Sequence, residues 1–212
     1  TKNTNTLVVQ DHPLIQELVT PEFGKFMTDL VRTFRPTRNT LLSERTSRRA
    51  DPDWTPGFLE DTQEIRSGDW KVAPIPDDLR DRRVEITGPP DRKMTINALN
   101  SGARVFMADF EDSLCPTWDG VLQGQANLRD AVRGTISFEH PQKGTYRLEP
   151  DHATLFVRPR GLHLDEAHAE VDGEAVPASL WDWGSYMWLN AKELIFSKRR
   201  PYFYLPKLEH WH

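Results

Sequence analysis

Between residues 84 and 206, short apolar runs alternate with segments that have helical periodicity. Four of the runs are typical of strands: Val84–Thr87, Val105–Phe110, Thr154–Arg158 and Tyr202–Leu205. The segments between them are long enough for the helical crossovers that parallel strands require. This alternation predicts a parallel sheet whose strands are joined through helices, the arrangement of α/β proteins.

Three helices are expected between these strands. Asp91 can cap a helix that runs to Asn100, and a second helix is predicted from Gln125 to Arg133, just before a glycine. Ser179 is expected to cap a third, longer helix that precedes the last strand. Residues 135–148 interrupt this rhythm and predict a small hairpin around the turn sequence Pro-Gln-Lys-Gly.

The alternation stops just after the fourth strand. A (β/α)8 barrel typically takes about 250 residues, and four strand–helix units are half of one. An aromatic edge strand left open would favour aggregation. We therefore expect residues 83–212 to form the N-terminal half of a (β/α)8 barrel, an α/β fold that a missing C-terminal half would close.

The first 82 residues have a different character. Thr20 and Pro21 are a helix cap and a first-turn proline, and apolar residues then follow at helical spacing as far as Pro36, where we expect the helix to end. A separate basic helix is predicted from Arg38 to Arg49, either as a solvated face or as a docking surface. Residues 1–82 are therefore expected to form a helical extension.

Residues 50–82 are rich in proline and glycine, which predicts a segment without long regular structure. Trp54 and Trp70 are expected to pin this segment against a larger body.

Composition excludes several classes of function. A net charge of −5 argues against a nucleic-acid partner, and no apolar run approaches the roughly 18 residues of a membrane span. Cys115 is the single cysteine, which excludes an internal disulfide and is typical of the reducing cytoplasm. Five histidines show no helical spacing for a metal pair: His152, His163, His168, His210 and His212.

Charged residues gather at two strand ends. Arg158 and Arg160 flank a proline that ends one strand, and alternation along a strand predicts that both point to one side. Asp109 and Glu111 share a face at the end of another strand. Ligands bind at the carboxyl ends of strands in barrels and open α/β sheets. The four side chains predict either an anion and metal site or a purely structural lattice of ion pairs.

Several longer segments carry a family resemblance. They are Asp69–Pro76, Arg83–Pro89, Asp91–Met94, Ile96–Ala103, Phe106–Ser113, Val157–Gly161 and Pro201–Lys207. In this order they resemble malate synthases of the shorter, A-type branch, over roughly residues 30 to 209. The resemblance implies an N-terminal portion of that enzyme: a helical clasp at residues 1–82, then the first half of a TIM barrel at residues 83–212.

The reaction implied by the resemblance joins acetyl-CoA to glyoxylate and releases malate and CoA, as part of the glyoxylate bypass. Arg158 matches the catalytic arginine that binds glyoxylate and stabilises the enolate of acetyl-CoA. Asp109 and Glu111 match acidic residues that line the metal and glyoxylate pocket, and Ser113 matches a contact of acetyl-CoA. Arg160 is also predicted to bind substrate, from its place at the strand end.

The resemblance also implies a Mg²⁺ cofactor, whose ligands are expected outside this chain together with the aspartate general base. This chain alone is therefore expected to be inactive until it meets the missing C-terminal half. The alternatives are an acyl-CoA lyase of the citrate-lyase β type and a catalytically silent fragment that acts as an assembly module.

Overall fold

The computed structural model describes residues 7–209. The residues before Leu7 and after Glu209 lie outside this range, and with them His210, His212 and the first part of the predicted clasp. The elements that follow one another along the chain are β1 (Val8–Val9), α1 (Ile15–Leu18), α2 (Pro21–Ala50), η1 (Glu60–Thr62), α3 (Gln63–Ser67), η2 (Asp77–Leu79), β2 (Glu85–Gly88), α4 (Arg92–Leu99), β3 (Val105–Asp109), α5 (Trp118–Val132), β4 (Ser137–His140), β5 (Gly144–Arg147), β6 (Thr154–Arg158), β7 (Asp165–Val171), β8 (Glu174–Pro177), α6 (Ala178–Phe196) and β9 (Tyr202–Phe203).

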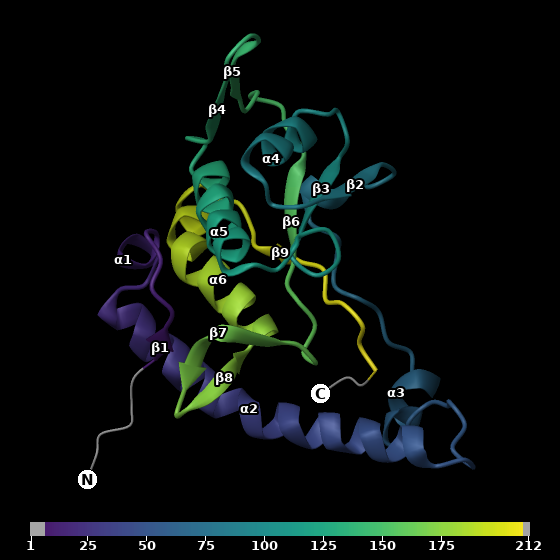
Figure 1. The fold of residues 1–212 in the computed structure, drawn as a ribbon. Coiled ribbons are helices and arrows are strands. Elements are labelled where there is room, and N and C mark those ends of the chain that lie inside the picture. Colours follow the sequence, from purple (N-terminus) through teal and green to yellow (C-terminus); the bar gives the residue numbers. More distant parts are fainter. Residues whose placement is uncertain (1–6, 210–212) are drawn as a thin grey trace.

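The predicted parallel sheet is confirmed. Its strands lie in the order β2-β3-β6-β9, and every neighbouring pair is parallel. The helices α4, α5 and α6 pack together beside it, and the antiparallel hairpin β4–β5 projects beyond them (Figure 1). Four parallel strands linked by helical crossovers form a partial (β/α)8 barrel, preceded by the helical extension that contains α2.

The two faces of the sheet have different roles. Phe106, Ala108 and Val157 point toward the helices and join the larger core, which also contains Leu128 and Tyr186. The alternate residues face the other way, because successive side chains of a strand point to opposite faces. Asp109 and Arg158 end β3 and β6, and β-ladder pairing sets them side by side.

The helix α2 runs without a break from Pro21 to Ala50, so the predicted end at Pro36 is wrong. Contacts made beyond the proline explain why the helix continues. The Arg38 side chain donates to the carbonyl of Leu162 at 2.5 Å and to the carboxylate of Asp165 at 2.7 Å. The predicted second basic helix is therefore the second half of α2, and at Arg38 it docks against the loop after β6.

Replacing Pro36 with alanine is expected to stabilise the chain by roughly 1–3 kcal/mol, because proline inside a helix lacks a hydrogen-bond donor and crowds the preceding turn. The side chain is exposed, so the substitution removes little packing. Urea unfolding followed by circular dichroism measures the effect. A loss of stability in Pro36→Ala would mean that the proline sets a bend on which the docking of α2 depends.

A second sheet, in the order β1-β7-β8, was not predicted from the sequence. The strand β7 reads Asp-Glu-Ala-His-Ala-Glu-Val, which is too polar for an apolar strand pattern. It is held by antiparallel pairing to β1 on one side and to β8 on the other. This sheet lies between α2 and α6 (Figure 1) and shares a core with them, formed by residues that include Met27, Val171 and Trp181.

Two helices begin elsewhere than predicted. The helix α5 starts at Trp118, where Thr117 accepts the cap hydrogen bond from the N–H of Gly120. The helix α6 follows Pro177 without a side-chain cap, so the predicted cap at Ser179 is wrong. Gly120 and Gly124 lower the helical propensity of the first turns of α5, so these turns were not predicted. Gly124 is nevertheless required there, because an added Cβ would lie 2.8 Å from the Phe110 ring.

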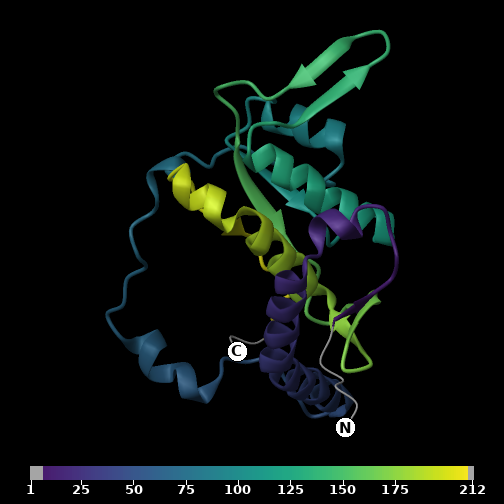
Figure 2. The ribbon, with the colours of Figure 1, turned by 90° about the vertical axis from the view of Figure 1, so that its left-hand side faces the viewer.

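The segment from residue 51 to residue 84 leaves the end of α2, runs out from the rest of the molecule and returns to β2 (Figure 2). Trp54 and Trp70 are 45% and 60% exposed, so the expectation that they pin the segment is wrong. Among residues 7–209, no helix is both long enough and apolar enough to cross a membrane.

Candidate functional site

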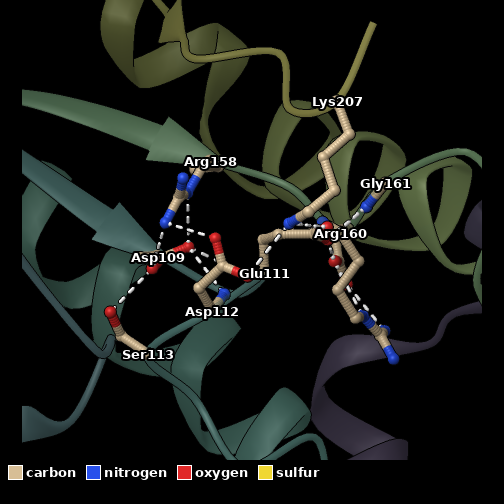
Figure 3. Close-up of polar contacts among 9 residues, drawn as sticks. Asp109, Glu111, Asp112, Ser113, Arg158, Arg160, Gly161 and Lys207 are labelled. Atoms are coloured by element: carbon tan, nitrogen blue, oxygen red, sulfur yellow. Dashed lines mark hydrogen bonds and ion pairs between the residues drawn. The ribbon is translucent and has the colours of Figure 1, made fainter.

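The centre of the site is a two-pronged ion pair between neighbouring strands. Arg158 Nε donates to Asp109 Oδ1 at 2.8 Å, and Nη2 donates to Oδ2 at 2.7 Å (Figure 3). Asp109 is fully buried, whereas the Arg158 side chain keeps 17% of its surface exposed. The pairing is direct because the ladder register sets these two residues opposite each other. The predicted convergence of the two strand ends is therefore present.

Asp109 accepts three further hydrogen bonds. The backbone N–H groups of Glu111 and Asp112 reach Oδ1 at 2.9 and 3.2 Å, and the Ser113 hydroxyl donates to Oδ2 at 2.6 Å. Burial raises the pKa of Asp109, but the bonds from Arg158, from Ser113 and from the two backbone groups outweigh it and lower the pKa to about 2. Asp109 is therefore an anion that orients Arg158, and it is not a proton acceptor near neutral pH.

The Asp109 carboxylate is expected to make folding sensitive to acid. Its folded-state pKa of about 2 lies below the ordinary value of 3.8, so its stabilising effect is complete above pH 3.8 and is lost as the pH falls toward 2. The shift corresponds to about 2 kcal/mol. Unfolding free energies measured over this range should fall less steeply in Asp109→Asn. Parallel curves for the two proteins would contradict the assignment.

The Arg158 guanidinium also reaches Asp112, with Nη2 3.0 Å from Oδ2. The hydrogen bonds to Asp109 are the main cause that raises the pKa of Arg158, so the guanidinium stays charged. The Nη1 group is different: within residues 7–209 no acceptor takes its hydrogen bonds. The ring of Tyr204 lies 6.0 Å from the guanidinium carbon, at the outer limit of a cation–π contact. Arg158 can therefore present one charged donor group to an anionic ligand.

Glu111 forms a second ion pair beside the first. Lys207 Nζ lies 2.8 Å from Glu111 Oε1, and the Gly161 N–H donates to Oε2. The sequence prediction assigned no role to Lys207, although it follows β9 as Arg160 follows β6. The rule that charged groups at strand ends are functional could have identified it. Tyr204 was also assigned no role, because the predicted strand continued to Leu205, whereas β9 ends at Phe203.

Arg160 points away from Arg158 (Figure 3), so the prediction that the two guanidinium groups share a side is wrong. The strand β6 ends at Arg158, and the alternation of side chains does not continue past the proline. Arg160 is 4% exposed and pairs with Asp182 and Glu166, each at 2.8 Å. Burial lowers the Arg160 pKa, but the two carboxylates outweigh it and raise the pKa. Substrate binding by Arg160 stays a prediction, and these contacts favour a structural role.

Within residues 7–209, no group of three or more histidine, cysteine, aspartate or glutamate side chains could hold a metal ion. The carboxylates at the site are already engaged: Asp109 with Arg158, and Glu111 with Lys207. They do not offer the open set of oxygen ligands that Mg²⁺ prefers. Of the histidines, His168 is a packing residue whose ring stacks on Trp118 with centroids 5.4 Å apart.

The fold and the site define a partial (β/α)8-barrel protein with a cluster of charged side chains at its strand ends. Two family models match the chain: "Malate synthase, N-terminal domain" at residues 12–64 and "Malate synthase, TIM barrel domain" at residues 154–212. The chain belongs to the malate synthase family, and it corresponds to an N-terminal portion of the proteins in this family.

Curated relatives agree with the family models. The chain is 54% identical to malate synthase of Myxococcus xanthus over 202 residues and 50% identical to malate synthase A of Escherichia coli over 198 residues. It is 52% identical over 199 residues to the bifunctional glyoxylate cycle protein of Caenorhabditis elegans. These matches cover 92–93% of the chain, but 37% of each of the two bacterial relatives and 21% of the nematode one.

Proposed function

We propose that this chain carries the Arg158 part of a malate synthase active site, for the condensation of acetyl-CoA with glyoxylate. The observation that carries the proposal is the Arg158 guanidinium, which Asp109 locks in place while its Nη1 group has no acceptor within residues 7–209. Acetyl-CoA and glyoxylate are the substrates that the resemblance implies. Both present oxygens that are anionic or become so during the reaction.

The chemistry requires a donor of this kind. A general base takes a proton from the methyl group of acetyl-CoA, and negative charge develops on the thioester oxygen of the resulting enolate. The enolate carbon attacks the aldehyde carbon of glyoxylate, and the aldehyde oxygen takes up a proton to give the malyl thioester. Water then hydrolyses this thioester and releases malate and CoA. A guanidinium is a rigid donor with a permanent charge, suited to stabilise an enolate or a carboxylate. Asp109 keeps that donor aimed, and the hydroxyl of Ser113 fixes Asp109 in turn.

We propose that the general base and the Mg²⁺ ligands lie outside the described residues. Asp109 is held as an anion by Arg158, so we propose that the general base comes from sequence beyond these 212 residues. The dependence on Mg²⁺ that the resemblance implies is proposed for the same region, and we assign none of the described residues to the metal. Two features support the proposal that this chain needs the remaining part. The strands β2 and β9 are the outer strands of the parallel sheet, and the chain spans 37% of the M. xanthus and E. coli relatives. A cytoplasmic location is proposed from the cysteine content.

A chimera tests the function. In it, this chain replaces the matching N-terminal portion of the M. xanthus relative, and free thiol is measured with acetyl-CoA, glyoxylate and Mg²⁺. Thiol release by the chimera that needs both substrates, with none from this chain alone, is the expected result. A folded chimera without thiol release overturns the proposal. Carbon–carbon cleavage of malyl-CoA or citryl-CoA with release of acetyl-CoA, in place of thioester hydrolysis, would favour a lyase. A soluble, monomeric, cooperatively melting chain would favour an assembly module.

A further inference from the structure

Lys207 approaches the site from the end of a third strand. It follows β9 and has a left-handed backbone, with φ at 51°. Its Nζ atom lies 2.8 Å from Glu111 Oε1 and 3.0 Å from Asp112 Oδ1 (Figure 3). Hydrogen bonds with Glu111, and then with Asp112, raise the pKa of Lys207, so the amine is a cation throughout the neutral range.

The carboxylate of Glu111 depends on this amine. The Glu111 side chain is 2% exposed, and a buried carboxylate is costly unless a cation and hydrogen bonds compensate it. Within the described part of the chain, Lys207 is its one ion-pair partner, and the Gly161 N–H occupies its second oxygen. Glu111 thus joins the ends of β3, β6 and β9 through a single side chain.

Asp112 links the amine to the proposed catalytic group. One of its oxygens lies 3.0 Å from Lys207 Nζ, and the other lies 3.0 Å from Arg158 Nη2. Two carboxylates next to Arg158 are therefore held by Lys207. Both carboxylates also interact electrostatically with Arg158, whose Nη1 group donates to no acceptor among residues 7–209. Without the Lys207 amine, Arg158 would be left to attract both of them.

We propose that Lys207 is a positioning residue: it holds Glu111 and Asp112 away from the Nη1 group of Arg158, and so keeps that group open to an anionic substrate. The inference rests on the proposed function for the identity of the substrate, glyoxylate. Lys207 does not itself contact the reacting atoms. When the Lys207 amine is lost, the carboxylate of Glu111 or Asp112 competes with glyoxylate for the Nη1 group of Arg158. Substrate binding is then weakened more than the chemical step is changed.

The kinetic test uses the chimera with Lys207→Met, Lys207→Gln and Lys207→Arg. Both neutral variants are expected to raise the KM for glyoxylate about tenfold with a smaller change in kcat, and arginine should restore part of the loss. The KM for acetyl-CoA should change less than twofold. The control is Lys25→Met, which breaks the exposed ion pair with Asp29 far from the site. Equal effects on both substrates, or no rescue by arginine, would overturn the inference.

A second test needs no activity and uses the 212-residue chain itself. The Gly161 N–H donates to Glu111, so release of Glu111 should speed hydrogen exchange at this amide by about tenfold or more in Lys207→Met and Lys207→Gln, and not in Lys25→Met. Unchanged exchange at Gly161 overturns the positioning role. Faster exchange together with an inactive chimera would retain that role and reject the proposed function.

Discussion

Replacing Arg158 with lysine in the chimera is expected to lower kcat by about 10²–10³, the loss typical for removal of one donor that stabilises an oxyanion. Lysine keeps the positive charge but has a single nitrogen with no planar fork. It can pair with Asp109 or reach a ligand, but it cannot do both in the geometry of the guanidinium. In the structure, Nε and Nη2 serve Asp109 while Nη1 has no acceptor within residues 7–209.

The measurement is thiol release under saturating acetyl-CoA and glyoxylate, with Arg80→Lys as the matched control. Arg80 is an exposed arginine that also pairs with an aspartate, Asp77, at 2.7 Å. Its replacement should leave kcat unchanged. Circular dichroism and urea unfolding of both variants separate loss of chemistry from loss of structure. If Arg158→Lys keeps more than half of the parent activity, the guanidinium is not the group that stabilises the developing charge.

The core of this site could be predicted from the sequence because it depends on short-range rules. Parallel strands bring their carboxyl ends to one edge, and strand alternation gives Asp109 a definite face. The pairing of Asp109 with Arg158 follows once β3 and β6 are neighbours, as they are. The roles of Arg158, Asp109, Glu111 and Ser113 toward substrates came from the family resemblance and stay proposals.

The failures have a common physical cause, which is that long-range contacts overrode local patterns. Arg160 was predicted to share a side with Arg158, but Glu166 on β7 and Asp182 on α6 hold it elsewhere. The strand β7 has no apolar pattern of its own and is formed by pairing with β1 and β8. The helix α2 passes through Pro36 because docking contacts beyond it outweigh a local preference.

The buried ion cluster around Arg160 leads to the second large prediction. Asp182, on α6, is fully buried and accepts from the backbone N–H of Arg160 at 2.9 Å, from Nε at 2.9 Å and from Nη2 at 2.8 Å. Asp182→Ala should lower the free energy of unfolding by about 3–5 kcal/mol, because it leaves a buried guanidinium with Glu166 as its remaining ion-pair partner. That loss is large compared with the 5–15 kcal/mol stability of a typical domain.

Urea unfolding at neutral pH measures this loss, and Asp29→Ala is the matched control. Asp29 pairs with Lys25 at 2.6 Å, but its side chain is 59% exposed, so its removal should cost less than about 1 kcal/mol. Asp182→Asn keeps the shape of the side chain, so its loss of unfolding free energy should lie between those of Asp182→Ala and Asp29→Ala. If Asp182→Ala costs no more than the control, the cluster does not anchor the loop after β6. The orientation of Gly161 toward Glu111 must then be maintained by contacts other than those of Arg160.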